Sequence, residues 1–210
     1  ETPSMSSTTS WHFIRHAPVT HLKGTVYGST DPVADVSDAA AFDALAKALP
    51  KEAIWVTSHL QRTHQTANAV HAAGYPTVAY AQDPRLGEQN FGDWHGMTHV
   101  DLHASRAPEY HRFWLAPAKE TPPGGESFLD VVARVSASMA ELTEKHAGQD
   151  IICVAHGGTI RAALSIALGI EPEKALAFST ENLSITIMDH IGESDGQPAA
   201  WRVRGVNLIA

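Results

Sequence analysis

Short apolar runs recur along the chain, and each is about as long as a buried strand. The first run ends at Phe13-Ile14, and the second covers Ile54–Thr57. Further runs predict strands at 77–80, 151–155, 184–188 and 201–206. Glycine, proline and polar residues separate the runs, which is typical of strands joined through surface loops.

Apolar residues at helical spacing lie between these runs. Phe42, Leu45 and Leu49 predict a helix that Ser37 caps and Pro50 ends. Two more helices are predicted, one beginning within 58–63 and ending near Gly74, the other running from His156-Gly157-Gly158 to Gly169. The clearest amphipathic pattern has steps of four and three and consists of Phe128, Val132, Val135, Met139 and Leu142. Ser127 and Asp130 precede it in the spacing of a capping box.

The alternation of strands with helices predicts an α/β fold. We expect a three-layer α/β/α sandwich whose central sheet is mostly parallel in its first part. At 210 residues the chain is sized for one domain, which we assign to residues 11–210. Residues 97–125 contain several prolines and a Gly-Gly pair, and they are interpreted as a lid-like insertion over the strand ends. Residues 1–10 are expected to be disordered.

The charge balance narrows the class of partner. Lys plus Arg total 15 and Asp plus Glu total 23, so the formal net charge is −8. Nucleic acid and anionic membranes need a basic face, so neither is expected as a partner, whereas a small anionic molecule remains compatible with a few buried cations. Cys153 is the only cysteine, and no apolar run is long enough to span a membrane. The first ten residues lack the apolar core of a signal peptide, so we expect a cytoplasmic protein.

Charged and histidine side chains follow several of the predicted strands. Arg15-His16 ends the first strand, Arg62 and His156 follow two later strands, and Glu88 lies between them. Because ligands of α/β proteins bind at the carboxyl ends of the strands, we expect these side chains to meet there. Two guanidiniums, two imidazoles and a carboxylate are the groups needed to move a phosphoryl group through a histidine.

Four sequence motifs make the chain resemble a known family. FIRHAP, SHLQRTHQTA, LGEQNFGDWHG and AHGG occur in the order and approximate spacing found in the histidine phosphatase superfamily, which has the phosphoglycerate-mutase-like fold. The resemblance runs from about residue 11 to the end of the chain. PPGGES and the AHGGTIRAAL–NLSI tail are most similar to the small bacterial branch that includes α-ribazole phosphatases.

The resemblance implies a phosphomonoester hydrolase with a phosphohistidine intermediate, and the chemistry of the residues agrees with it. His16 would attack phosphorus while neutral, with its other ring nitrogen held by a backbone carbonyl. Arg15 and Arg62 would bind phosphoryl oxygens through their planar forks. Glu88 would act as the general acid and then as the base that activates water.

The remaining phosphate contacts are expected at the start of the last predicted helix. His156 would donate to a phosphoryl oxygen, and the amides of Gly157 and Gly158 would add partial positive charge. No cofactor and no metal are expected, because the cations are part of the chain. The expected partner is a small phosphomonoester, such as α-ribazole phosphate or a sugar phosphate, and the oligomeric state cannot be deduced.

The loop after the first strand departs from the family pattern. Ala17 stands where a glycine commonly follows Arg-His, and Leu22 stands where the family often has an asparagine. Thr20, His21 or Ser29 are candidates to supply the missing phosphate contact. Arg106, His111, Arg112 and Trp114 are candidates to line the substrate pocket.

Three alternative functions remain open at this stage. A phosphoglycerate mutase would use the same centre, but mutases of the family carry Glu-Arg-His-Tyr-Gly where this chain has Glu88-Gln89-Asn90-Phe91-Gly92. A metal-binding protein is suggested by His95, His99 and His103, which are four residues apart and could share a helix face. The third alternative is a non-catalytic phospholigand-binding protein on the same fold.

Overall fold

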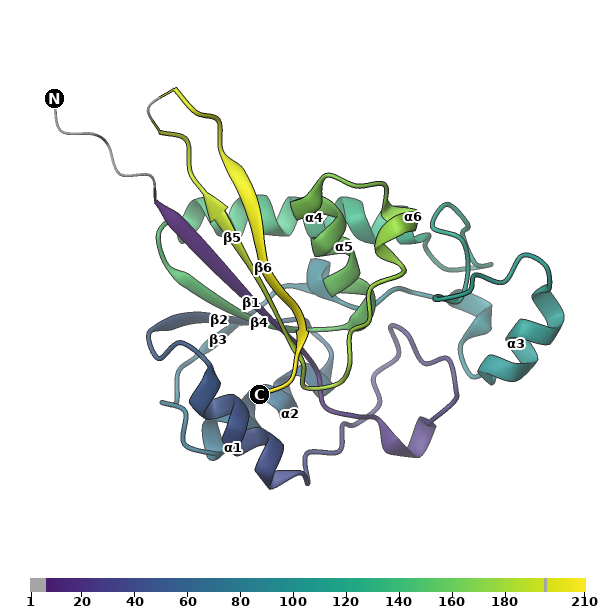
Figure 1. The fold of residues 1–210 in the computed structure, drawn as a ribbon. Helices are drawn as coiled ribbons and strands as arrows, with labels where there is room; N and C mark the ends of the chain where they lie inside the picture. Colours follow the sequence, from purple (N-terminus) through teal and green to yellow (C-terminus); the bar gives the residue numbers. More distant parts are fainter. Residues whose placement is uncertain (1–6, 195) are drawn as a thin grey trace, which may run out of the picture.

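A six-stranded sheet forms the middle of the molecule, with the strands in the order β3-β2-β4-β1-β5-β6 (Figure 1). The computed structural model describes residues 7–194 and 196–210. The strands are β1 (Thr8–Arg15), β2 (Ala53–Thr57), β3 (Tyr80–Gln82), β4 (Asp150–Ala155), β5 (Ile185–Ile191) and β6 (Ala200–Leu208). The first four are parallel to one another, which confirms the predicted parallel first part, and β5 and β6 add as antiparallel strands.

Helices cover both faces of the sheet and complete the predicted three layers. They are α1 (Ala39–Ala48), α2 (Gln61–Ala72), α3 (His99–Arg106), α4 (Phe128–Lys145), α5 (Gly157–Leu168) and α6 (Pro172–Ala175). In Figure 1, α4, α5 and α6 lie on one side of the sheet and α1 and α2 on the other. Short 3-10 turns occur at Thr20–Leu22, Pro84–Leu86 and Gly92–Trp94.

Strand β1 is apolar on both faces because helices bury both. Its Trp11 and Phe13 belong to the core under α4 and α5, whereas Ile14 belongs to the core under α1 and α2. Side chains alternate across a strand, so successive apolar residues feed two separate cores. Strand β4 repeats this pattern, with Cys153 in the first core and Val154 in the second. Burial raises the pKa of the Cys153 thiol, as expected for a small hydrophobe in a strand.

Two local features confirm or correct the predicted helix starts. The capping box before α4 is present, because Ser127 accepts from the Asp130 amide and Asp130 accepts from the Ser127 amide. The predicted cap of α1 is wrong. Asp38, not Ser37, accepts the free amide of Ala41, while Ser37 bonds to Asp35.

Two predicted strand positions also need correction. The third strand lies at Tyr80–Gln82, so the strand predicted at 77–80 overlaps it only at Tyr80. Residues 8–10 were expected to be disordered, but they form the start of β1 and pair with β5. Backbone pairing sets both positions, β3 on β2 and residues 8–10 on β5, and this pairing does not require apolar side chains. Residues 1–6 lie outside the described residues.

The segment 97–125 contains α3 and is otherwise irregular. It packs with the loop after β1 around a small core of its own, made of Val26, Phe91, Trp94, Leu102, Leu115 and Ala116. In Figure 1, α3 lies far from the sheet on the side where the segment projects. That it acts as a lid stays a prediction. Within the described residues, every helix is too short or too polar to cross a bilayer.

Candidate active site

His16 lies where β1 leaves the sheet, with its ring almost fully buried. Its backbone amide still donates to Ala155 of β4 (3.0 Å), and its carbonyl accepts from Asn182 Nδ2 (2.8 Å). The ring Nδ1 lies 2.7 Å from the carbonyl oxygen of Ala17, so it is the protonated nitrogen and Nε2 carries the lone pair. The structure therefore places the ring as the sequence predicted, with one nitrogen held by the backbone.

His156 is fully buried beside His16. The centroids of the two rings are 5.2 Å apart. Its Nε2 lies 2.8 Å from the hydroxyl oxygen of Ser58, a residue that the sequence analysis did not single out. Among the described residues, its Nδ1 has no hydrogen-bond partner. Ser58 thus fixes the orientation of the ring and leaves one nitrogen available.

Both imidazoles are neutral at physiological pH. Burial is the main cause that holds the pKa of His16 well below its usual range, and the positive charges of Arg62 and Arg15 lower it further. Burial and then Arg62 likewise depress the pKa of His156. A neutral ring has a free lone pair, so His16 is in the protonation state that a nucleophile needs.

Two arginines next to His16 are tethered by backbone carbonyls. Arg62 is 0% exposed and donates from Nη1 to the carbonyl of Thr30 (2.7 Å) and from Nη2 to that of Gly28 (2.6 Å). Arg15 donates from Nη1 to the carbonyl of Thr180. The Nε atoms of both arginines are buried without a partner among the described residues. These tethers fix both guanidiniums and leave part of their donors unused.

Glu88 reaches the start of α5. Its carboxylate accepts from the Gly158 amide (3.1 Å) and from the Gln89 amide (2.8 Å). A Cβ at Gly158 would lie 2.2 Å from Glu88 Oε1, so only glycine leaves room for the carboxylate. Gly158 therefore allows Glu88 to approach the helix start.

A cavity of about 310 Å³ opens in front of these groups. Arg15, His16 and Glu88 form part of its wall, and Arg62 and His156 lie buried behind His16. Aromatic residues form another part of the wall, namely Phe91, Tyr110, Phe113 and Trp114. The five residues predicted from separate strand ends are thus brought to one place.

Of the four candidates for the pocket wall, two line the cavity. Arg112 and Trp114 do so. Arg106 instead pairs with Glu120 and lies over the Trp94 ring, 4.2 Å from its centroid. His111 caps the backbone amides of Phe113 and Trp114 and lies 3.1 Å from Glu173, so it holds the segment.

The loop after β1 contributes residues other than those predicted. Thr20, His21 and Ser29 do not line the cavity, whereas Thr25, Val26, Tyr27 and Gly28 do. The Tyr27 ring also lies 5.2 Å from the Arg62 guanidinium. The loop therefore shapes the wall and holds Arg62, because its carbonyls at 28 and 30 accept from that side chain.

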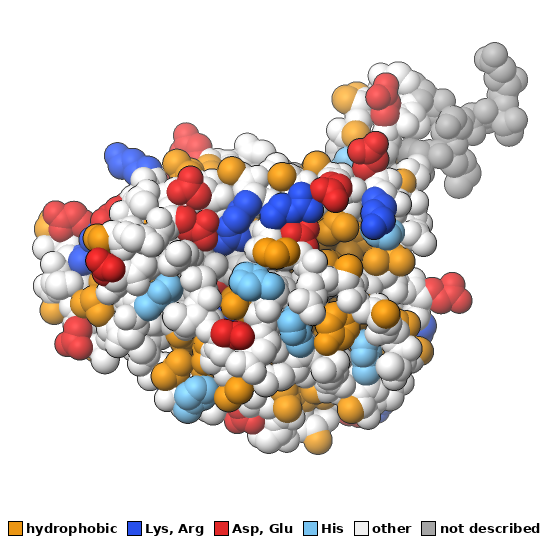
Figure 2. Space-filling model, turned by 180° about the vertical axis from the view of Figure 1, so that it is seen from behind, with side chains coloured by type: hydrophobic (Ala, Val, Ile, Leu, Met, Phe, Trp, Pro, Cys, Tyr) orange, Lys and Arg blue, Asp and Glu red, His pale blue; other side chains and the backbone are white. Residues whose placement is uncertain are grey.

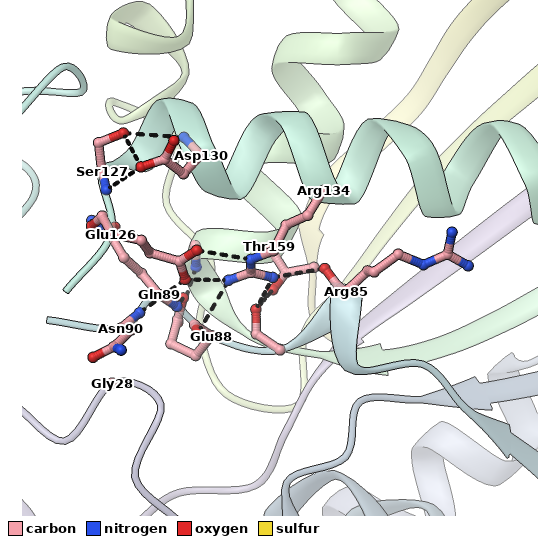
Figure 3. A network of polar contacts seen from close by, with 12 residues as sticks. Gly28, Arg85, Glu88, Gln89, Asn90, Glu126, Ser127, Asp130, Arg134 and Thr159 are labelled. Carbon is pink, nitrogen blue, oxygen red and sulfur yellow. Dashed lines mark hydrogen bonds and ion pairs between the residues drawn. The ribbon is translucent and has the colours of Figure 1, made fainter. Parts of the chain in front are cut away.

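Behind the Glu88 loop lies a network centred on Arg134 of α4 (Figure 3). Arg134 donates to both carboxylate oxygens of Glu126, at 2.7 and 3.1 Å. It also donates to the carbonyls of Arg85 (2.6 Å), Gly87 (2.8 Å) and Glu88 (3.2 Å). All five N–H donors of a guanidinium are used in this way. The sequence analysis did not single out Arg134, although its partner Glu126 lies in the PPGGES motif.

Arg161 is a second arginine that the sequence analysis did not single out. It lies one turn into α5 and lines the cavity. Its Nε donates to the carbonyl of Phe178 (2.9 Å), and its guanidinium lies 4.7 Å from the Trp114 ring centroid. The spacing of four residues from Gly157 could have placed it on the same helix face, above the strand ends.

The three spaced histidines do not form a metal centre. His95 precedes α3 and accepts from the Phe91 amide (3.2 Å), His99 lines the cavity, and His103 stacks on Tyr110. Figure 2 shows histidines at separate points of the face seen from behind. Among the described residues, no group of three His, Cys, Asp or Glu side chains is placed to hold a metal ion.

This fold and constellation define a protein class. The chain belongs to the histidine phosphatase superfamily (branch 1), whose family profile matches residues 11–203. It is similar to the glucosyl-3-phosphoglycerate phosphatase of Mycolicibacterium vanbaalenii, with 33% identity over 218 residues that cover 94% of this chain and 93% of that protein. The native structure of a mycobacterial glucosyl-3-phosphoglycerate phosphatase matches with a TM-score of 0.81 and 27% identity, covering 96% of this chain and 99% of that chain.

Two further likenesses are more limited. A bifunctional protein of Mycobacterium tuberculosis is 40% identical over 113 residues, which cover 54% of this chain and 30% of that protein. The chain thus spans about 30% of that longer relative. A structure described as a putative alpha-ribazole-5'-P phosphatase from Escherichia coli matches with a TM-score of 0.73, 23% identity, and coverage of 96% and 98% of the two chains. That likeness shows the shared fold alone.

Proposed function

We propose that this protein hydrolyses a phosphomonoester of a small metabolite through a phosphohistidine formed on His16. The observation that carries the proposal is the state of the His16 ring. It is neutral, its Nδ1 is fixed on the Ala17 carbonyl, and it borders a cavity that Arg15 and Glu88 also line. Membership of the histidine phosphatase superfamily and the likeness to named phosphatases support hydrolysis.

In the first step, the lone pair on His16 Nε2 attacks phosphorus and forms the N–P bond. The P–O ester bond breaks, and its electron pair stays on the leaving alkoxide oxygen, which takes the proton of the Glu88 carboxylic acid. Arg15, Arg62 and the free Nδ1 of His156 stabilise the charge that develops on the phosphoryl oxygens. The alcohol then leaves.

In the second step, the Glu88 carboxylate takes a proton from water as the water oxygen attacks phosphorus. The N–P bond breaks, its electron pair returns to His16 Nε2, and inorganic phosphate leaves. Glu88 is again a carboxylic acid, so both the acid and the nucleophile are restored. The cycle uses the chain's own cations for charge stabilisation.

The mutase alternative uses the same first step but keeps water out. Gln89 and Asn90 stand where mutases of the family carry arginine and histidine, so two cations for a second substrate group are missing from this loop. Gln89 is buried and instead bonds to Glu126 and to the Trp114 indole. This favours hydrolysis. Faster interconversion of 2- and 3-phosphoglycerate than phosphate release would reverse the preference.

The decisive experiment traps the phosphoenzyme. Wild-type protein mixed with a ³²P-labelled phosphomonoester and quenched in alkali should retain label, because phosphohistidine survives alkali. His16→Ala should retain none and should lose roughly 10⁴-fold or more in kcat/KM, as expected when a nucleophile is removed. His146, which is partly exposed and caps the end of α4, provides the control variant His146→Ala. Absence of label in active wild-type protein would refute the proposal.

A further inference from the structure

Ser58 lies in the turn between β2 and α2, where it contacts one ring nitrogen of His156. Both residues are 0% exposed, and Ser58 Oγ lies 2.8 Å from His156 Nε2. The same turn leads into the helix that carries Arg62. Ser58 is not part of the cavity wall, so it can affect a bound ligand only through the residues that it contacts.

The other hydrogen bonds of this turn leave the Ser58 proton available for His156. The Leu60 amide donates to Ser58 Oγ (3.1 Å), so this oxygen already accepts one hydrogen bond. Thr63 Oγ1 lies 3.3 Å from Ser58 Oγ, but the Thr63 hydroxyl is closer to the Leu60 carbonyl, to which it donates at 2.8 Å. Of the two acceptors within reach of the Ser58 hydroxyl, His156 Nε2 is the nearer by 0.5 Å. These distances favour donation from Ser58 to Nε2.

The tautomer of His156 decides whether its second nitrogen can bind an anion. The ring is neutral, so it has one proton to place on either nitrogen. Nδ1 has no partner among the described residues, whichever nitrogen is protonated. A phosphoryl oxygen would pair with an N–H at this position and would be repelled by a lone pair. Only the tautomer with the proton on Nδ1 therefore satisfies this buried atom once phosphate is bound.

We propose that Ser58 is a positioning residue that fixes His156 in the tautomer with the proton on Nδ1. The Ser58 hydroxyl donates to Nε2, which keeps Nε2 an acceptor and makes Nδ1 the N–H that binds a phosphoryl oxygen. The inference rests on the proposed phosphatase function, in which His156 stabilises the charge on that oxygen.

The two neighbouring imidazoles then share one tautomer but have opposite roles. His16 is fixed by the Ala17 carbonyl, which accepts from Nδ1, and it presents the lone pair of Nε2 to phosphorus. His156 is fixed by the Ser58 hydroxyl, which donates to Nε2, and it presents the N–H of Nδ1 to oxygen. The partner of the inward nitrogen thus determines whether each ring is a nucleophile or a hydrogen-bond donor.

The tautomer can be measured in wild-type protein. Long-range ¹H–¹⁵N correlation spectra of protein labelled with ¹⁵N-histidine show which ring nitrogen carries the proton, and the signals of His156 are those that disappear in His156→Asn. We expect the proton on Nδ1. In Ser58→Ala a larger share should move to Nε2, because this nitrogen has lost its donor. A proton on Nε2 of wild-type His156 would overturn the proposal.

Hydrolysis of p-nitrophenyl phosphate measures the consequence for the reaction. Ser58→Ala should lower kcat/KM by about 10- to 100-fold, as expected when a buried hydrogen bond to a charged group is lost. Ser58→Thr keeps a hydroxyl and should recover part of this loss. Thr63→Val is the matched control, because it removes the other buried hydroxyl of the turn and should leave kcat/KM nearly unchanged.

A double-mutant cycle with His156→Asn separates positioning from a general effect on the fold. The side-chain amide of asparagine can place an N–H close to the position of Nδ1, and it has no tautomer for Ser58 to fix. In this background Ser58→Ala should therefore change kcat/KM by less than about two-fold. Losses that multiply in the double variant would overturn the positioning role, since Ser58 would then act independently of His156.

The outcomes separate this proposal from the proposed function. Failure of wild-type protein to hydrolyse p-nitrophenyl phosphate would count against the phosphatase function, whereas the spectra would still report the tautomer of His156. A folded Ser58→Ala variant with the wild-type kcat/KM would overturn the role of Ser58 and leave the phosphatase function intact. If Ser58→Ala does not fold, as urea unfolding would show, the wild-type spectrum decides: a proton on Nδ1 supports the proposal, and a proton on Nε2 overturns it.

Discussion

The loop that carries Glu88 has two sides, and the arginines on these sides are used differently. Behind the loop, Arg134 donates all five of its N–H groups, to Glu126 and to three backbone carbonyls. In front of the loop, Arg161 donates one hydrogen bond, from Nε to the Phe178 carbonyl. The Nε atoms of Arg15 and Arg62 have no hydrogen-bond partner among the described residues. The side chains are chemically identical, so the number of protein acceptors decides which arginine holds the chain and which is available for a ligand.

The difference extends to the rigidity of the site. Thr159 adds hydrogen bonds to the carbonyls of Leu86 and Gly87, and the Asn90 amide donates to Glu126. The backbone carbonyls of residues 85–87 therefore all accept hydrogen bonds from side chains on α4 or α5. A catalytic carboxylate must be held to within a fraction of an ångström, and this network supplies that constraint from behind.

The largest effect is expected from the group that faces the cavity. Glu88→Gln removes the proposed proton donor while keeping the shape of the side chain. We expect about a 10³-fold loss in kcat/KM for alkyl phosphates and a smaller loss for p-nitrophenyl phosphate, whose leaving group needs little protonation. Steady-state kinetics on the two classes of ester measures this. Equal losses would remove Glu88 from the acid role.

The two glycines at the start of α5 should differ in their tolerance of a methyl group. In Gly158→Ala the new Cβ displaces the Glu88 carboxylate, and we expect a loss of about 10²-fold. In Gly157→Ala the nearest atoms are Arg161 Nη1 at 3.0 Å and Thr180 Oγ1 at 3.1 Å, and the flexible arginine end can move. The loss should be at least several-fold smaller. Equal kcat/KM values for the two variants would contradict the described position of Glu88.

The hydrogen-bond network of Arg134 behind the loop should affect kcat/KM only by positioning Glu88. We expect Arg134→Met to lower kcat/KM by about 10-fold or more and to do so mainly for alkyl phosphates. In the double variant with Glu88→Gln, the Arg134 change should add little, because its effect passes through the same carboxylate. Arg85→Met is the control, since that side chain points away from Glu88 to Asp83 and Glu141 (Figure 3). Additive losses would mean that Arg134 only stabilises the fold.

The remaining effect is on the pH dependence of stability and not on kcat/KM, and it arises from the front of the site. The folded-state pKa values of His16 and His156 are depressed by burial, so the unfolded chain binds more protons below about pH 6.5. The free energy of unfolding should therefore fall as the pH drops, by up to about 1.4 kcal/mol per histidine and pH unit. Urea unfolding at pH 7.5 and 5.5 measures this. His16→Asn should show a smaller difference between the two pH values.

The sequence predicted the sheet, the helices and the convergence of the five central residues. Burial on both faces makes the strands β1, β2 and β4 visible as apolar runs, and strand ends determine where Arg15 and His156 lie. The sequence could not show which partner each polar side chain binds. Arg106, a pocket candidate, forms an ion pair with Glu120, whereas Arg161 donates from Nε to the Phe178 carbonyl and pairs with no carboxylate of the described residues. Whether an arginine finds an acceptor depends on tertiary contacts, which spacing does not encode.

The position of the short strand β3 and the geometry of the loops were also not predicted correctly from the sequence. β3 pairs only with β2, so its position follows backbone register more than apolar pattern. The candidates Thr20 and His21 were chosen by distance along the chain, but the 3-10 turn at Thr20–Leu22 keeps them off the cavity wall. Loop geometry is set by local turns and by partners far away in the sequence.

The central position of β1 has a consequence for synthesis on the ribosome. Its neighbours β4 and β5 lie far along the chain, and the carbonyl of His16 accepts from Asn182, 166 residues later. A nascent chain that carries only the first half has His16, the proposed nucleophile, but neither strand that flanks β1. The proposed reaction centre therefore forms only after residue 182 has been synthesised, and fragments that stop before Asn182 lack its hydrogen bond to His16.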